Sequence, residues 1–186
     1  LTRLIAAGEH VLSTLGEPLK TLAPASFERV VYLGSGPLTG LARESALKIL
    51  EMTAGRIATW SDSPLGFRHG PKSVLNDRTL AIVYLSSDPY TRSYDLDIVH
   101  ELRSTVGPAR VVVLDAVDDT RARVEGVWHL PGLAGIEDDS LALPYVLCAQ
   151  LLGLHASVAL GLSPDNPFPS GEINRVVQGV TIYPLD

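Results

Sequence analysis

The sequence has a single cysteine, Cys148, among its 186 residues. No disulfide can therefore form within the chain, and a metal site built from several cysteines is excluded. The spacing H-E-x-x-H of many zinc enzymes is missing as well, so we expect no metal site. A chain this poor in cysteine suits a reducing compartment, and we expect a cytoplasmic protein.

Runs of lysine and arginine are also missing. The chain has 15 basic and 21 acidic residues, which give a formal net charge of −6. This balance argues against nucleic acid or an anionic membrane surface as the main partner, and it leaves small molecules and other proteins. With 46% hydrophobic residues, the chain has the size and composition of one globular domain with a full core.

One long run lacks charge entirely. Residues 141–162 (LALPYVLCAQLLGLHASVALGL) contain no Asp, Glu, Lys or Arg and are long enough to cross a membrane. However, Pro144, Gln150 and His155 interrupt the run, and its flanks are acidic rather than basic. We therefore expect no membrane span, but a helix buried between a sheet and a second layer, which another subunit could supply.

Short β-branched runs alternate with helical patterns along the chain. The clearest strands are residues 29–33 (RVVYL), 79–85 (TLAIVYL) and 110–114 (RVVVL), and helical patterns cover 38–53 and 92–104. Continuous apolar strands separated by helices are typical of a parallel sheet covered on both faces. We therefore predict a doubly wound α/β domain with three layers, αβα. The remaining predicted elements are helices at 1–20 and 141–162 and strands at 57–60, 127–130 and 180–183.

The same pattern suggests how the chain is organised. Residues 1–28 are predicted to form a helix and link that enter the domain, and residues 29–186 to form the domain itself. Within it, residues 163–186 begin with the proline-rich stretch SPDNPFPSGE and are expected to form a C-terminal arm. The chain does not begin with methionine, and residues 1–12 lack a signal-peptide pattern, so we expect a piece of a longer polypeptide or a processed one.

Ligands of doubly wound domains bind where the strands end, so the loops after the strands are the places to search. The first such loop, GSGPLTG at 34–40, has neither the G-x-G-x-x-G spacing of a dinucleotide site nor the Lys-Ser/Thr of a P-loop. Gly34, Ser35 and Gly36, with a helix N-terminus behind them, would suit an anion or a sugar hydroxyl. A tight turn explains the two glycines equally well.

The next helix and the loop after the second strand supply a carboxylate and an imidazole. Glu44, Lys48 and Glu51 share one helix face, which is also what a solvated row of ion pairs would show. His69 stands in GFRHGPKS with glycines on both sides, which suits either a shaped functional loop or a structural histidine. If the two groups meet at the sheet edge, the carboxylate can move a carbon-bound proton and the histidine can serve a sugar-ring oxygen.

The loop LSSDPYT at 85–91 is a weaker candidate. Ser86, Ser87 and Thr91 could hold a phosphate through their hydroxyls and the backbone amides. The loop lacks glycine, however, and Asp88 would repel a phosphate. This loop therefore predicts a phosphate site only weakly.

Two long stretches resemble a known family. LGSGPLTGLARESALKILEMTAGRIATWSDSPLGFRHGPKSV at 33–74 and SPDNPFPSGEINRVVQGVTIYPL at 163–185 closely resemble the sugar isomerase (SIS) domain of the tagatose-6-phosphate ketose/aldose isomerase family, which includes galactosamine-6-phosphate deaminase/isomerases. The likeness runs from about Val30 onward and implies a flavodoxin-like fold. Members typically carry two SIS domains in tandem. This chain looks like the second, and the first usually supplies the loop that grips the sugar phosphate.

The resemblance also implies roles for single residues. The isomerase domain of glucosamine-6-phosphate synthase, a more distant relative, has a motif similar to ALKILE, which places a proton-shuttling carboxylate at Glu51 with Lys48 beside it. Its H-G-P loop is similar to the loop of His69, which would open the sugar ring and in that relative reaches the neighbouring subunit's site. That relative has a lysine in its tail where this sequence has Gln178. The substrate site is expected to be lined by Gly34, Ser35, Gly36, Asn174, Arg175 and Gln178.

The resemblance therefore implies an aldose-ketose isomerase, with deamination, that acts on an amino-hexose 6-phosphate such as galactosamine 6-phosphate and uses no cofactor. The expected partners are a companion SIS domain and a second copy of the chain, with the site shared between subunits. SIS domains also serve as sugar-phosphate sensors in transcription regulators, and sensing needs neither Glu51 nor His69. A purely structural half is the third alternative, favoured if those two residues lie far apart with no pocket between subunits.

Overall fold

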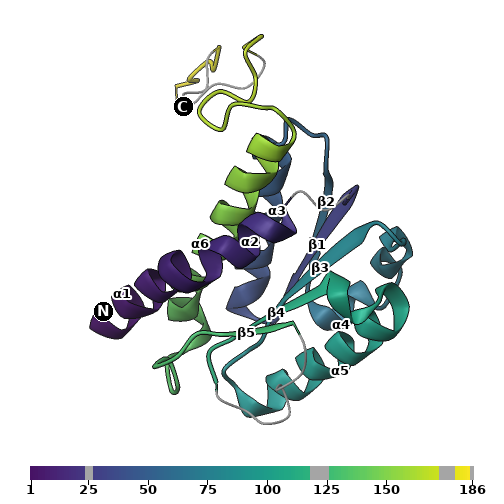
Figure 1. The fold of residues 1–186 in the computed structure, drawn as a ribbon, viewed down its shortest axis with the longest axis vertical. Coiled ribbons are helices and arrows are strands. Elements are labelled where there is room, and N and C mark those ends of the chain that lie inside the picture. Colours follow the sequence, from purple (N-terminus) through teal and green to yellow (C-terminus); the bar gives the residue numbers. More distant parts are fainter. Residues whose placement is uncertain (24–26, 118–125, 172–178, 185–186) are drawn as a thin grey trace.

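The computed structural model describes residues 1–23, 27–117, 126–171 and 179–184. Five parallel strands form one sheet in the order β2-β1-β3-β4-β5 (Figure 1). This is the flavodoxin-like order of doubly wound sheets, so the predicted α/β fold is confirmed. The strands are β1 (Arg29–Gly34), β2 (Ala58–Asp62), β3 (Thr79–Tyr84), β4 (Val111–Asp115) and β5 (Val127–His129).

Helices precede, connect and cover these strands. They are α1 (Thr2–His10), the π-helical turn η1 (Val11–Leu15), α2 (Gly16–Leu22), α3 (Pro37–Met52), α4 (Pro64–Phe67), the short 3₁₀ turns η2 (Pro71–Val74) and η3 (Pro108–Arg110), α5 (Pro89–Val106) and α6 (Asp138–Ala159). The ends of the predicted helices and strands differ from these bounds by a few residues, as expected where capping rather than hydrophobic period decides the end.

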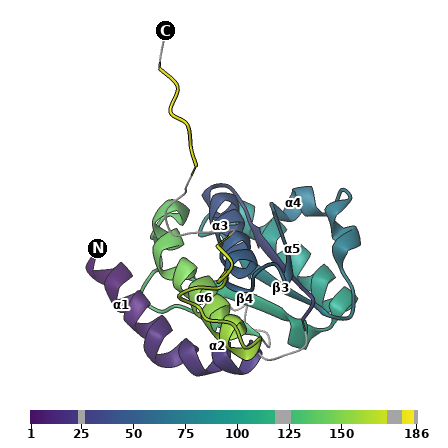
Figure 2. The same cartoon turned by 90° about the horizontal axis from the view of Figure 1, so that it is seen from above.

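Two cores, one on each face of the sheet, form the layers. Because neighbouring side chains of a strand point to opposite faces, Val30 and Tyr32 of β1 join the core under α3 and α6. Val31 and Leu33 join the core under α4 and α5. Figure 2 shows α3 and α6 on one side of the sheet and α4 and α5 on the other.

The N-terminal helix is part of the larger core. α1, η1 and α2 follow one another without a break, which confirms the helix predicted at 1–20. Every fourth residue of this segment is buried in the same core as the inner side of α6, namely Ala7, Val11, Leu15 and Leu19. The first 22 residues thus pack as part of the domain as well as leading into it.

The uncharged run forms α6. By length and composition alone this helix could cross a membrane, but half of its most apolar window is buried inside the domain. Tyr145, Cys148 and Leu152 lie in the core, and burial raises the pKa of the Cys148 thiol to about 12. Leu143 and Val158 on the other side are exposed. α6 is therefore a core helix with an apolar outer side.

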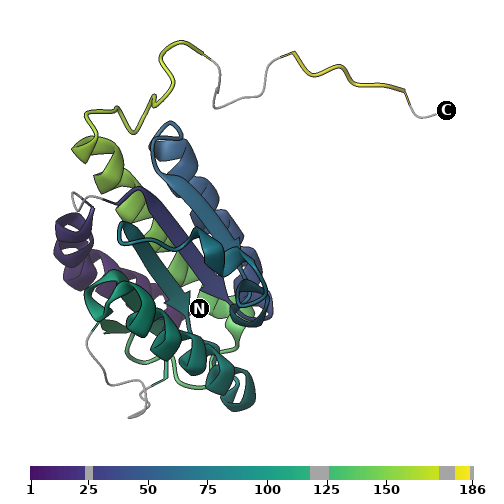
Figure 3. The same cartoon turned by 90° about the vertical axis from the view of Figure 1, so that its right-hand side faces the viewer.

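The chain end departs from the prediction. Residues 179–184 form no strand and extend away from the sheet (Figure 3). Val180, Ile182 and Tyr183 are exposed. The strand predicted at 180–183 is therefore wrong. The run has the side chains of a strand, but it leaves the domain after α6 and pairs with no described strand, and β-branched composition alone does not form a sheet.

Candidate functional site

Glu44, Lys48 and Glu51 lie on one face of α3, as their spacing predicts. The Lys48 Nζ atom lies 2.8 Å from Glu51 Oε2 and 3.3 Å from Glu44 Oε1. The hydrogen bond to Glu51 raises the pKa of Lys48, so the ammonium form is favoured. The Glu51 side chain is 36% exposed, so a ligand at the surface can reach it. Lys48 thus fixes the direction of an accessible carboxylate.

The two glycines around His69, Gly66 and Gly70, are required for different structural reasons. A Cβ on Gly66 would lie 2.5 Å from Asp62 Oδ1, so no larger residue fits there without a shift. Gly70 has a φ of 141°, which L side chains rarely adopt. Pro71 then begins the turn η2. The backbone on both sides of the histidine is therefore closely determined.

Glu101 of α5 anchors this loop. Its Oε2 atom lies 2.9 Å from Arg68 Nε, and its Oε1 atom accepts a hydrogen bond from Lys72. The bond from Lys72 is the largest of the effects that lower the pKa of Glu101. The two basic residues flank His69, whose side chain is exposed and whose ring has no hydrogen-bond partner among the described residues. The loop is thus anchored while its imidazole faces solvent.

The structure does not bring Glu51 and His69 together within one chain. Glu51 belongs to α3, which packs on the face of Tyr32, whereas the loop of His69 follows α4, whose Phe67 packs on the face of Leu33. Which subunit supplies His69 was left open by the sequence, and a meeting of the two side chains stays a prediction. The connection from β1 to β2 runs toward one edge of the sheet, and the connection from β2 to β3 runs back toward the other. Because such crossovers are right-handed, the helices in these two connections, α3 and α4, lie on opposite faces.

A second polar cluster lies at the carboxyl ends of β1 and β3, where Ser35 and Ser86 were predicted but the buried carboxylate that joins them was not. Asp95 of α5 accepts hydrogen bonds from Ser35 Oγ at 2.5 Å and from the Ser86 backbone N–H at 2.9 Å. Asp95 is fully buried, and this burial raises the pKa of its carboxyl group. The residue thus joins the loops that follow two adjacent strands.

Arg92 and Asp115 form a buried ion pair beside it. The two terminal nitrogens of Arg92 donate to the two carboxylate oxygens of Asp115 at 2.8 and 2.6 Å, and both side chains are 2% exposed. Arg92 and Asp95 continue the buried row that Val99 and Leu102 form on α5. Charged residues within an apolar helical row are the sequence signal that could have revealed this cluster.

The predicted phosphate loop is already bonded to carboxylates of its own chain. Ser86 Oγ donates to Asp138 Oδ2 at 2.5 Å, and the Ser87 N–H and Oγ donate to Asp138 Oδ1 at 2.7 and 2.8 Å. The Thr91 N–H donates to Asp88, which caps α5. A phosphate role for these donors stays a prediction. The carboxyl-edge network, as we call it, comprises Ser35, Ser86, Ser87, Arg92, Asp95, Asp115 and Asp138.

The GSG turn has a structural explanation of its own. A Cβ on Gly34 would lie 2.5 Å from the Leu38 carbonyl oxygen, and Gly36 has a φ of 52°. The tight turn therefore requires both glycines, and the Ser35 hydroxyl is bonded to Asp95. A substrate role for residues 34–36 stays a prediction. The other predicted lining residues, Asn174, Arg175 and Gln178, lie outside the described residues.

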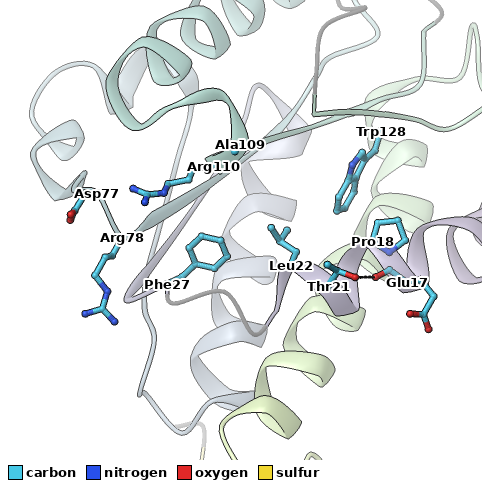
Figure 4. Close-up of a pocket in the computed structure, with 10 residues that line it drawn as sticks. All are labelled: Glu17, Pro18, Thr21, Leu22, Phe27, Asp77, Arg78, Ala109, Arg110 and Trp128. Atoms are coloured by element: carbon cyan, nitrogen blue, oxygen red, sulfur yellow. Dashed lines mark hydrogen bonds between the residues drawn. The ribbon is translucent and has the colours of Figure 1, made fainter.

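A cavity of about 690 Å³ lies at the opposite, amino edge of the sheet, where β1, β3 and β4 begin. Figure 4 shows Leu22, Phe27 and Trp128 around it, with Arg78 and Arg110 to one side. None of the predicted site residues lines this cavity. Within the described part of the chain, no group of three or more His, Cys, Asp or Glu side chains is placed to hold a metal ion.

Comparison with known proteins identifies relatives along nearly the whole chain. The chain is 58% identical over 186 residues, 99% of its length, to a Streptomyces coelicolor protein provisionally named D-galactosamine-6-phosphate deaminase AgaS. It is 46% identical over 177 residues, 95% of its length, to the Escherichia coli D-galactosamine-6-phosphate deaminase AgaS. The chain spans about half the length of these curated relatives, 48% and 46% respectively. No family model matches it.

The fold gives the same answer. A Clostridium novyi crystal structure, provisionally described as a tagatose-6-phosphate ketose/aldose isomerase, superimposes with a TM-score of 0.91 at 41% identity. The match covers 98% of this chain and 48% of that one. The resemblance inferred from the motifs at 33–74 and 163–185 is therefore confirmed. The chain belongs to the sugar isomerase (SIS) domain family, in the branch that contains AgaS and the tagatose-6-phosphate ketose/aldose isomerases.

Proposed function

We propose that this chain is the second of two SIS domains in a galactosamine-6-phosphate deaminase that also isomerises the sugar. The observation that carries the proposal is the 46% identity, over almost the whole chain, to a protein named for that activity. The chain spans about half of such relatives, which supports a companion domain of similar size. We place the protein in the cytoplasm.

The proposed chemistry uses two proton-transfer groups. His69 gives a proton to the ring oxygen as its bond to C1 breaks, and it regains the proton that the C1 hydroxyl releases when the aldehyde forms. Glu51 takes the proton from C2, which yields an enolamine, and returns a proton to C1. Water then hydrolyses the resulting C2 imine, so that ammonia leaves and tagatose 6-phosphate forms. The steps are the opening of a hemiacetal, proton transfers next to a carbonyl carbon and the hydrolysis of an imine, so the proposal requires no metal or redox cofactor.

The geometry around Glu51 supports its assignment as the base. Lys48 holds one carboxylate oxygen at 2.8 Å, and the side chain stays partly exposed. Lys48 would also stabilise negative charge that develops on the open-chain sugar nearby. The 34–36 turn, Asn174, Arg175 and Gln178 are proposed to line the rest of the site.

Two copies of the chain would share the site. The helix of Glu51, α3, packs on one face of the sheet and α4, which precedes His69, on the other, so we infer that a second copy brings its own exposed His69 to the Glu51 of the first. Exposed apolar residues on α3 and α6, among them Leu47, Leu50 and Leu143, support covering of that face by another domain or subunit. We therefore propose a homo-oligomer.

The test is ammonia release from galactosamine 6-phosphate by the complete parent protein. Glu51→Gln and His69→Ala should each lower the rate by about 10²–10⁴-fold, the usual contribution of a general acid or base. Glu44→Gln is the matched control, because it removes the other carboxylate that pairs with Lys48. Binding without turnover of galactosamine, glucosamine and ketose 6-phosphates would replace this proposal with the sensor function.

Sharing of the site has its own test. Equal amounts of the two inactive variants are mixed and allowed to exchange subunits. In a two-fold symmetric dimer half of the dimers are then mixed, and each mixed dimer has one intact site, so about a quarter of the wild-type activity should return. No recovery after demonstrated exchange would contradict sharing.

A further inference from the structure

The Ser86–Ser87 turn lies at the place where doubly wound folds bind anionic ligands. It follows β3, next to the end of β1, and the strand order reverses at this point. Three donors converge there, the Ser86 hydroxyl and the Ser87 hydroxyl and backbone N–H. Such a set of hydroxyls and amides is suited to a phosphate.

In this chain the three donors bind the Asp138 carboxylate. The three hydrogen bonds measure 2.5, 2.7 and 2.8 Å, in the range of short charge-assisted bonds, and they use both carboxylate oxygens. Ser86 is 1% exposed, so the contact is built into the domain rather than formed at its surface. Asp138 is the first residue of α6, where a negative charge is favoured by the helix dipole. The carboxylate thus accepts from the three donors that a phosphate would need.

The surroundings would also repel a phosphate. The adjoining cavity of about 420 Å³ is lined by Asp88, Glu137, Asp138 and Asp139 together with Pro37 and Ser87, and among the described residues by no basic one. Arg92 lies close to the turn, but its terminal nitrogens bind Asp115. A phosphate would therefore meet several negative charges at short range, with no cation of the described lining to compensate them.

We propose that Asp138 is an internal phosphate mimic that excludes the sugar phosphate from the switch point of this domain. The assignment of a sugar phosphate as the excluded ligand rests on the proposed function, whereas exclusion of inorganic phosphate does not. The phosphate group of the substrate is then bound outside this turn. Asp138 is thus a specificity-determining residue that does not contact the substrate.

The test counts phosphate-binding sites in the complete parent protein by calorimetric titration with inorganic phosphate at constant ionic strength. Asp138→Ala frees the three donors and removes a charge, so it should bind one more phosphate per chain than the wild type. Asp139→Ala is the matched control, because it removes the same charge from the same helical turn, and its carboxylate bonds only the Ser140 N–H among the described contacts. The added site should disappear in the Asp138→Ala/Ser87→Ala double variant. A folded Asp138→Ala protein with no added site overturns the proposal.

A second variant tests the same point without touching Asp138. Ser87→Ala in the wild-type background should leave the number of phosphate sites unchanged, because Ser87 binds Asp138 rather than a ligand. Loss of a wild-type phosphate site in Ser87→Ala overturns the proposal even if Asp138→Ala does not fold. Neither titration depends on turnover, so failure of the proposed deaminase activity would be recognised separately.

Discussion

The carboxyl-edge network and the residues proposed for catalysis are held in opposite ways. In the network, Arg92, Asp95 and Asp115 are buried, and each is hydrogen-bonded to another residue of the network. Glu51 and His69 instead stand at the surface, on elements that pack against opposite faces of the sheet. The network lies where ligands of such folds usually bind, yet its polar groups already have partners.

The difference shows that position in the fold does not by itself identify a site. Donors at a strand end are available to a ligand only when the chain supplies no acceptor for them, and here Asp95 and Asp138 are those acceptors. Exposed groups anchored by neighbours, such as Glu51 beside Lys48, can act on a substrate that another subunit helps to enclose. The comparison therefore predicts that the network contributes mainly to stability and the exposed pair mainly to turnover.

The largest expected effect on stability follows from breaking the buried ion pair. Asp115→Ala leaves the Arg92 guanidinium buried without this carboxylate, which should cost about 3–5 kcal/mol of unfolding free energy. Urea unfolding of the purified protein measures the loss. Glu17→Ala is the control, because its pair with Lys20 is highly exposed and contributes at most about 1 kcal/mol. Similar losses in both variants would contradict the division between network and surface.

Much of the fold could be predicted from the sequence because its strands are short continuous apolar runs. The run at 180–183 had the same composition and formed no strand, since composition does not tell whether a partner strand is near. The spacing of Lys48 and Glu51 was enough to predict their contact, because helical geometry is local. The separation of Glu51 from His69 depends on the order of the strands, which no local pattern contains.

The carboxyl-edge network was not predicted for a related reason. Asp138 is 51 and 52 residues from the serines that it binds, and no periodicity links positions so distant. Arg92 and Asp95 were detectable in principle as charges within a buried helical row. Their partners were not, because the carboxyl ends of separate strands meet only in the folded sheet.

A smaller effect is expected at Glu101. It lies on α5, the helix that also carries Arg92 and Asp95 of the network, and it anchors the loop of His69. Glu101→Gln weakens the anchors to Arg68 and Lys72, so we expect kcat for ammonia release to fall about tenfold, or about 1.4 kcal/mol, while KM stays nearly constant. Stability should change by at most about 1 kcal/mol, because the pairs are partly exposed. Asp97→Asn on the same helix is the control. A rise in KM with unchanged kcat would contradict a role in positioning His69.

The pH dependence of the unfolding free energy tests the effect of burial on Asp95. Its pKa is raised by burial above the ordinary value of 3.8, so the folded state binds the proton more tightly than the unfolded state. Protonation of Asp95 therefore stabilises the folded state. This contribution is complete when the pH is below the ordinary pKa, and it is lost as the pH rises through the raised pKa. Asp95→Asn should lack this loss, because an amide does not titrate. The variant can still donate to Ser35 and accept from Ser86. Parallel pH profiles of unfolding free energy in wild type and variant would contradict the prediction.

The smallest change in stability is expected at Glu51. Glu51→Gln removes one partly exposed ion pair with Lys48, so its unfolding free energy should stay within about 1 kcal/mol of the wild type, although ammonia release collapses. Urea unfolding and the ammonia assay on the same preparation measure both quantities. A loss comparable to that of Asp115→Ala would mean that Glu51 supports the fold. The reduced activity could then no longer be assigned to chemistry at its carboxylate.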